Sequence, residues 1–168
     1  MAGATAGAMM AEQRVPKVYH HGRVMHLANR AMTALTRAGL VPHAAVLTVT
    51  GRTSGLPRST PVTAIEQGGA LWLVSPYGTV SWVRNARASG EVTLAKRRTT
   101  RRFAVREATP AEAGPVLKRY VAIAPIVLPY FVAGRHDPAE AFAAEADRHP
   151  VFELVPLEAG EPGSPSAR

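Results

Sequence analysis

The sequence predicts an α+β fold in which helices flank an antiparallel sheet or a small barrel. Three observations lead to this class. Short runs of β-branched and apolar residues, separated by turn residues, fill the middle of the chain. Helical patterns stand before, between and after these runs rather than alternating with each of them, as they would around a parallel sheet. The chain has 168 residues, which suits one domain with a sizeable core.

The first element is an amphipathic helix. We expect residues 1–14 to be a disordered leader, because they lack the basic start and the long apolar core of a signal peptide. From Gly22 to Ala38 apolar side chains repeat at helical spacing, and a second side carries Arg23, Arg30 and Arg37. Gly39 then ends this helix.

Five strands are predicted next. They cover Ala45–Thr50, Arg58–Glu66, Ala70–Ser75, Glu91–Lys96 and Arg101–Glu107. Gln67-Gly68-Gly69 and Arg97–Thr100 have the composition of hairpin turns. Pro61 removes a ladder donor from the second strand, which predicts a sheet edge or a bulge where a flat ring could lie against backbone. A plain edge-strand proline is an equal alternative.

The remaining helices are predicted from their caps. Thr109 precedes Pro110 and has Glu112 in its first turn, which indicates a helix that runs until Pro125. Ser81 could cap a short helix over 82–88 that Gly90 closes. A third helix is expected over 140–148 and a last strand over 151–155. The composition of 158–168 predicts a disordered tail, so a single domain spans 15–157.

Composition excludes several kinds of functional site and favours certain ligands. The absence of cysteine excludes disulfides, a thiol nucleophile, a thiolate zinc site and a cysteine-ligated cluster. Seventeen arginines and three lysines against twelve acidic residues give a net charge of +8, which favours an anionic ligand, nucleic acid or an acidic membrane surface. We expect no nucleic acid, because Phe103 alone stands near the Arg97–Arg102 cluster, where interleaved aromatic residues would be needed. That cluster could instead contact an anionic ligand tail or simply be solvated.

Other chemistries fit poorly. The apolar stretch Val121–Val132 is far shorter than the roughly 20 residues of a spanning helix and contains two prolines. His20, His21 and His26 do not share one helix face and lack a carboxylate at ligand spacing, so no metal is expected. There is no G-x-S-x-G elbow and there are two aspartates, which disfavours hydrolase chemistry.

The densest signal is the turn from Thr50 to Arg58. Its glycines allow close backbone approach, while its N–H groups, its hydroxyls and the guanidiniums of Arg52 and Arg58 can bind an anion. The turn is not a P-loop, because it lacks the Gly-Lys-Ser/Thr ending. A polar hairpin turn with solvated arginines is the alternative, and on physical grounds alone it is the better supported.

Residue order beyond the turn supports the anion-binding interpretation. The run TGRTSGLPRSTPV is followed by two strands, by Ser75-Pro76-Tyr77-Gly78 and by Ser81-Trp82-Val83-Arg84-Asn85. This order resembles the deazaflavin-dependent nitroreductase family over roughly 45–156. The resemblance implies a split β-barrel of antiparallel strands with flanking helices, related to barrels that bind flavin mononucleotide. It also implies coenzyme F420 and hydride transfer to an organic acceptor.

The resemblance implies cofactor contacts along three stretches. Phosphate would meet Arg52, Thr53 and Ser54, and the deazaflavin ring would lie beside Arg58, Ser59, Thr60, Pro61, Val62 and Thr63. The other side would be closed by Val74, Ser75, Pro76 and Tyr77 and by Trp82, Val83, Arg84, Asn85 and Ala86. Trp82 could equally anchor its short helix on the barrel.

The chain also departs from the family pattern. Many relatives carry lysine where Thr53 stands. Nitroreducing members place several tyrosines in the stretch that here reads 124–130, where Tyr130 is the one phenol and our candidate catalytic residue. A rim tyrosine is an equal reading of Tyr130. The more apolar pocket favours a quinone-like, enone-like or lipid-like acceptor over nitroimidazoles.

Alternatives of other classes stay open from sequence. A non-catalytic module could hold F420 or a fatty acyl ligand in the same barrel. We place the chain in the cytoplasm as a monomer or homodimer, with the arginine face of the 22–38 helix as a candidate peripheral membrane contact at the inner face of the membrane.

Overall fold

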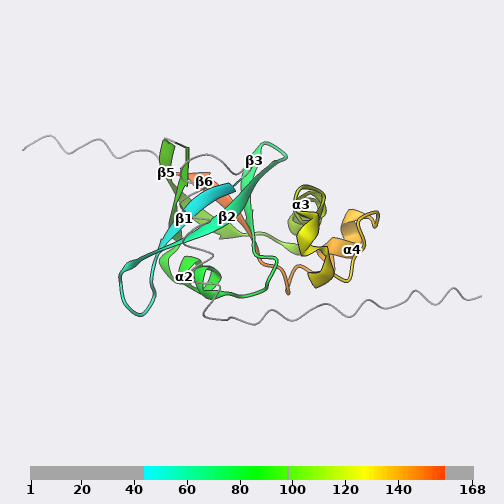
Figure 1. Ribbon diagram of the computed structural model, residues 1–168, viewed down its shortest axis with the longest axis horizontal. Helices are drawn as coiled ribbons and strands as arrows, with labels where there is room; N and C mark the ends of the chain where they lie inside the picture. The colour runs from blue at the N-terminus through cyan, green and yellow to red at the C-terminus, as the bar shows by residue number, and fades with distance from the viewer. Residues whose placement is uncertain (1–43, 98, 158–168) are drawn as a thin grey trace, which may run out of the picture.

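The computed structural model describes residues 44–97 and 99–157 (Figure 1). The expected leader, the 22–38 helix with its membrane contact and the 158–168 tail lie outside the described residues and stay predictions. Within the described ranges no helix has the length and apolar character that a membrane crossing requires.

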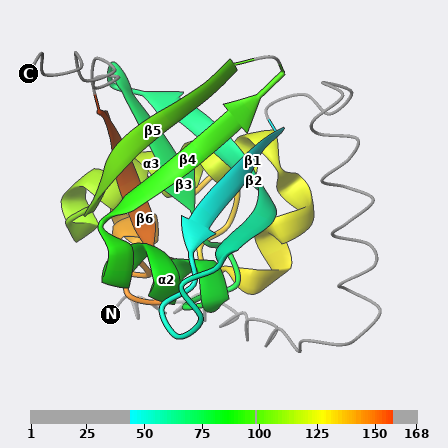
Figure 2. The same ribbon diagram turned by 90° about the vertical axis from the view of Figure 1, so that its left-hand side faces the viewer.

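Six antiparallel strands close into a barrel (Figures 1 and 2). The order around the barrel is β1-β2-β3-β6-β5-β4, with every neighbouring pair antiparallel. This confirms the predicted α+β class with an antiparallel barrel and flanking helices. The strands are β1 (Ala44–Thr50), β2 (Pro57–Gln67), β3 (Ala70–Val74), β4 (Glu91–Lys96), β5 (Thr99–Glu107) and β6 (Val151–Pro156).

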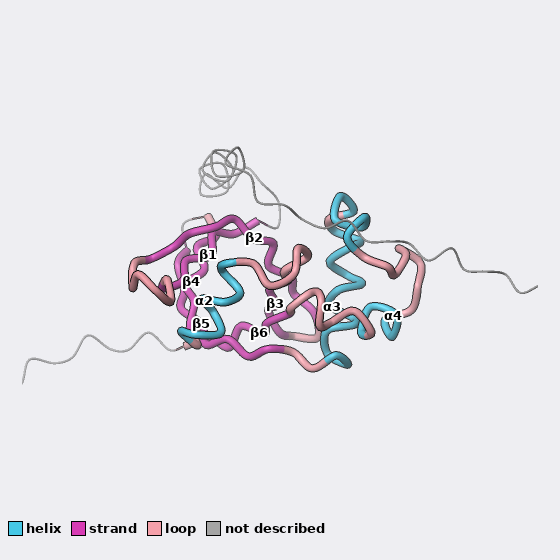
Figure 3. Tube along the Cα trace, turned by 90° about the horizontal axis from the view of Figure 1, so that it is seen from below, coloured by secondary structure: helices cyan, strands magenta, loops and turns pink. Residues whose placement is uncertain are grey.

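The helices lie at one end and on one side of the barrel. Helix α2 (Ser81–Ser89) lies below the barrel, and α3 (Pro110–Ile123), the 3-10 turn η1 (Pro125–Tyr130) and α4 (Ala139–Ala143) lie beside it (Figures 1 and 3). Gly90 ends α2 at φ 70°, as predicted. The expected Ser81 cap is wrong, because Val80 is the N-cap and makes no side-chain cap bond. The third helix is also shorter than expected, since i→i+3 bonds replace regular helix beyond Ala143.

Two apolar clusters meet at the strands. One fills the barrel and includes Leu47, Leu73 and Phe103. The other packs the outer face of the sheet, at Ile65 and Trp72, against the inner side of α3. Because side chains alternate along a strand, Thr63 lies on the same face of β2 as Ile65 and faces the helices.

Strand β2 has one open edge. It pairs with β1 from Pro57 to Thr63, but its pairing with β3 begins only at Ala64. The stretch 57–63 therefore has backbone that no other strand covers on that side among the described residues. Pro61 stands in this stretch, which confirms the predicted edge position and explains why the missing N–H costs no ladder bond.

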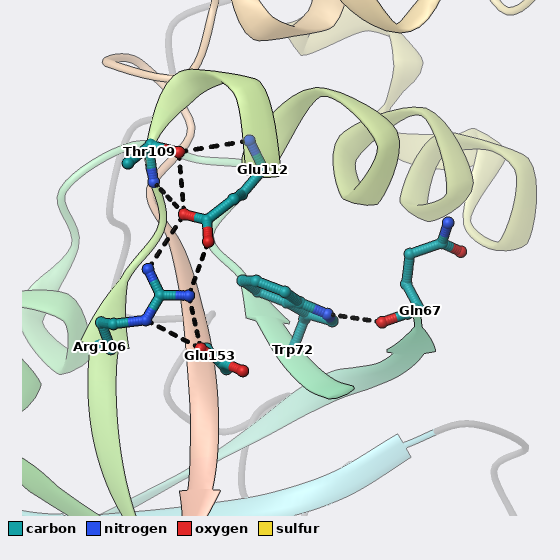
Figure 4. Close-up of polar contacts among 6 residues, drawn as sticks. All are labelled: Gln67, Trp72, Arg106, Thr109, Glu112 and Glu153. Carbon is teal, nitrogen blue, oxygen red and sulfur yellow. Dashed lines mark hydrogen bonds and ion pairs between the residues drawn. The ribbon is translucent and has the colours of Figure 1, made fainter. Parts of the chain in front are cut away.

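A charged network fixes α3 to the barrel (Figure 4). The Arg106 guanidinium bonds Glu112 on α3 at 2.8 Å and Glu153 on β6 at 2.5 Å. Thr109 and Glu112 form the predicted capping box, in which the Thr109 N–H donates to the Glu112 carboxylate at 2.8 Å. The base of α3 is thereby tied to two strands.

Candidate functional site

The turn between β1 and β2 closes on its own backbone. The Gly51 N–H donates to the Leu56 carbonyl at 2.9 Å, and the Gly55 N–H donates to the Gly51 carbonyl at 2.8 Å. Gly55 has φ 65°, which a residue with a Cβ rarely adopts. At Gly51 a Cβ would lie 2.8 Å from Ser54 Oγ and 3.1 Å from the Leu56 carbonyl. Both glycines are therefore required by the shape of the turn.

Asn85 on α2 holds this turn. Its Oδ1 accepts the Arg52 backbone N–H at 3.3 Å and the Arg52 guanidinium Nη1 at 3.2 Å. Asn85 is buried although it is polar, and these bonds offset its desolvation. The sequence-predicted residues Arg52 and Asn85 thus meet, although they stand 33 positions apart.

The turn has free donors and unpaired positive charge. Backbone N–H groups of Thr53 and Ser54 have no hydrogen-bond partner among the residues the structure describes, and both residues are exposed. Arg58 and Arg84 are exposed as well, and within the described ranges neither forms an ion pair. Together with Arg52 these groups fit an anionic phosphodiester.

The open edge of β2 continues from this turn. The Ser59 hydroxyl lies 2.8 Å from the Thr48 hydroxyl on β1. Thr60 and Pro61 are half-buried, and Val62 packs on the barrel core. Thr63 bonds the Tyr120 phenol on α3. The stretch 58–63, which is predicted to lie beside the ring, therefore begins at Arg58 and ends next to the Tyr120 phenol.

Three tyrosines gather beyond Thr63. The rings of Tyr77 and Tyr130 meet edge to face, with centroids 4.9 Å apart and planes at 84°. Burial, and then the neighbouring Tyr77, raise the pKa of the Tyr120 phenol well above its ordinary value. Tyr120 therefore stays protonated and can donate. Tyr120 was not predicted as a site residue from the sequence, although its spacing from Val116 and Leu117 places it on the buried side of α3.

Several predicted contact residues lie in the core instead. Val83 and Ala86 have no exposed surface, and Val74 is 3% exposed. The side chains of Val83 and Ala86 on α2 and of Val74 on β3 point inward. They support the site from behind and have almost no surface that a ligand could touch. Pro76 is buried too, and it takes part through its carbonyl.

Trp82 has the contacts of an anchor. Its ring packs edge-on against Phe152, with centroids 5.8 Å apart, and it lies against the barrel cluster. The indole is half-buried. These contacts favour the reading in which Trp82 holds α2 on the barrel.

The loop after β3 is tightly held. The Ser75 hydroxyl donates to the Gly78 carbonyl at 2.6 Å, and the Ser75 N–H donates to the Pro150 carbonyl at 2.9 Å. Gly78 has φ 78°. This loop presents Tyr77, which is 39% exposed, toward Tyr130.

The segment η1 is an exposed apolar surface beside these rings. Ile126 is 82% exposed, whereas its neighbour Val127 is 3% exposed and packs in the core under α3. The two prolines of η1 keep it from continuing α3 as regular helix. Ile126 therefore faces away from the core on an otherwise apolar segment.

Comparisons with known proteins find similar sequences and folds. The F420H(2)-dependent quinone reductase family matches residues 22–131. A solved F420-H2 dependent reductase (FDR-A) is similar to 67% of this chain and 94% of its own, at 24% identity and TM-score 0.50. A protein of unknown function from Agrobacterium tumefaciens str. C58 is similar at 18% identity and TM-score 0.50, over 74% of this chain and 53% of its own. No curated protein sequence matches.

Proposed function

Because the chain belongs to the F420H2-dependent quinone reductase family, we propose that it reduces an apolar acceptor of quinone or enone type. Family membership makes it an F420H2-dependent reductase with F420 as cofactor. The choice of acceptor is our proposal. It rests on the exposed apolar η1 segment, with Ile126 82% exposed, beside the Tyr77–Tyr130 ring pair.

The turn and α2 would hold the anionic part of the cofactor. Arg52 is already held by Asn85, so little conformational freedom is lost when it binds an anion. Arg58 and the N–H groups of Thr53 and Ser54 add charge-assisted hydrogen bonds. The deazaflavin ring would lie along the open edge of β2, where Pro61 leaves no ladder donor unpaired.

The tyrosines would position and donate the proton that the acceptor needs. Reduced F420, when bound, supplies a hydride. The acceptor also needs a proton at its oxygen, and the Tyr130 phenol is our candidate donor. Tyr77 orients that phenol through the ring contact, and Thr63 and Tyr120 complete a polar edge next to it. The apolar side chains of η1 exclude water from the acceptor.

Quinones and enones suit this wall better than highly polar acceptors do. A flat apolar ring buries its faces against Ile126 and the tyrosine rings, and its carbonyl oxygen can reach a phenol. A nitroimidazole has several polar atoms, and η1 offers one phenol and otherwise apolar side chains. Desolvating those unpaired atoms opposes binding.

Fluorescence titration with F420 and with flavin mononucleotide tests the cofactor. We expect F420 to bind more tightly, and we expect Arg58→Ala to weaken it by about 10- to 150-fold through loss of a charge-assisted bond. Lys118→Ala on α3 removes the same charge away from the turn and should leave affinity unchanged. Equal loss in both variants would mean that only net charge matters.

Acceptor-dependent oxidation of reduced F420 tests the reaction. Stopped-flow mixing with an apolar quinone, an enone and a nitroimidazole should give the fastest oxidation with the first two. Oxidation that no acceptor accelerates, at full F420 occupancy, would contradict the proposed acceptor class.

A further inference from the structure

Glu145 holds the chain two and three residues after Tyr130, at Val132 and Ala133. Its carboxylate is 4% exposed and accepts the Ala133 N–H at 2.6 Å and the Val132 N–H at 2.9 Å. Arg148 adds an ion pair at 3.1 Å. A buried carboxylate with these partners fixes the position of the backbone that follows η1.

His149 holds the chain directly before Tyr77. Its Nδ1 lies 3.0 Å from the Pro76 carbonyl. Since a carbonyl only accepts, Nδ1 carries the proton and donates. The imidazole also stacks on the Phe131 ring, with centroids 3.9 Å apart and planes at 22°. His149 therefore contacts both segments that carry the ring pair.

The two residues form one unit behind the rings. His149 Nε2 lies 3.7 Å from the Glu145 carboxylate. That Nε2 atom is buried and has no hydrogen-bond partner within the described ranges. Burial lowers the pKa of His149, so the ring is neutral at pH 7 and its Nε2 lone pair is unsatisfied. An apolar side chain would avoid this penalty but would lose the hydrogen bond to the Pro76 carbonyl, so the histidine is explained by its contact with the loop before Tyr77.

We propose that Glu145 and His149 are positioning residues that set the Tyr77–Tyr130 ring pair and thereby the fit of the acceptor. The inference rests on the proposed function of those rings. Glu145 fixes the η1 side and His149 fixes the loop side, so both rings depend on the 145–149 segment. Cofactor affinity should depend far less on the 145–149 segment, because the arginines proposed to bind the anion belong to the β1–β2 turn and α2.

Two variants of His149 separate its contacts. His149→Phe keeps the stacking on Phe131 but loses the donor to Pro76, whereas His149→Asn keeps a donor at the position of Nδ1. We expect His149→Phe to raise the quinone KM about tenfold, in line with the effect of a displaced positioning group, with F420 affinity nearly unchanged. His149→Asn should restore most of the wild-type KM. Exposed His136→Asn is the control.

A second readout needs neither cofactor nor turnover. Fluorotyrosine labelling gives ¹⁹F resonances, which Tyr77→Phe and Tyr130→Phe assign. In His149→Phe both resonances should shift or broaden, and His149→Asn should return them toward wild type. Unchanged resonances, or a melting temperature and F420 affinity that fall together with acceptor turnover, would overturn the positioning role. If the wild type neither binds F420 nor oxidises reduced F420 in the presence of an acceptor, the proposed function fails while the resonances still decide the inference.

Discussion

Asn85 accepts two hydrogen bonds from Arg52, one from its backbone N–H and one from its guanidinium. One amide oxygen therefore sets both the turn and the direction of its arginine. The oxygen comes from α2, so the helix below the barrel and the β1–β2 turn are held side by side (Figure 2).

Asn85→Ala should weaken F420 binding by about tenfold, since losing the acceptor leaves Arg52 mobile and each such bond contributes roughly 0.5 to 1.5 kcal/mol. Asn85→Asp keeps the acceptor but adds a negative charge beside the ligand, so it should weaken binding as well. Fluorescence titration measures both. Ser89→Ala, at the far end of α2, is the control, and an equal loss there would remove Asn85 from the site.

Ile126→Asp should lower turnover with an apolar quinone while leaving the melting temperature almost unchanged, because this side chain is 82% exposed. Val127→Asp is the matched contrast. It buries an unpaired carboxylate at a site that is 3% exposed, and it should lower the free energy of unfolding by about several kcal/mol. Thermal melts beside the quinone assay give the comparison. Turnover that Ile126→Asp does not change would show that the acceptor does not touch η1.

The strands and the main caps could be predicted from sequence, because alternation, turn glycines and the Thr109 cap act over a few residues. Gly68 and Gly69 show this well, since both adopt positive φ in the turn that joins β2 to β3. The length of α4 could not be predicted in the same way. Its sequence continues in helical residues, yet the chain tightens into turns after Ala143.

The candidate site was predicted only in part. Arg52 and Asn85 were named from the family resemblance, but their mutual contact needs the closed barrel. Val83 and Ala86 stand between site residues in sequence, yet helical geometry turns their side chains inward, so adjacency in a motif did not mean that a side chain is exposed. Tyr120 was missed because its role depends on α3 packing beside β2, a long-range arrangement.

Gly114→Ala should destabilise the protein although it replaces glycine inside a helix. At an exposed helical site this change gains up to about 1 kcal/mol. Here the new Cβ would lie 2.5 Å from the Ala139 carbonyl and 3.0 Å from the Ala143 Cβ, so α3 and α4 must separate. We expect a net loss of about 1 to 3 kcal/mol in urea denaturation. Ala122→Gly, at an exposed position of α3, measures the propensity effect alone, and a stabilised Gly114→Ala would show that the helices do not pack this closely.

Glu112→Gln should lower the melting temperature at pH 7 by a few degrees, and the difference from wild type should disappear in acid. The Arg106 side chain, and then the Thr109 backbone and hydroxyl, lower the pKa of Glu112 from 4.5 to about 2. A carboxyl group whose pKa is lower in the folded chain stabilises the fold at any pH above its ordinary pKa. This stabilisation is lost as the pH falls through the folded pKa.

Glutamine keeps an acceptor for the capping box, so the variant isolates the charge that Arg106 binds. Melts at intervals from pH 7 to pH 2 should therefore begin to converge below about pH 4.5, the ordinary pKa, and should meet near pH 2, the folded pKa. Glu140→Gln, in the first turn of α4, is the control, because it removes an exposed carboxylate that forms no ion pair within the described ranges. Parallel pH curves for wild type and Glu112→Gln would mean that the Arg106 bridge does not stabilise the fold.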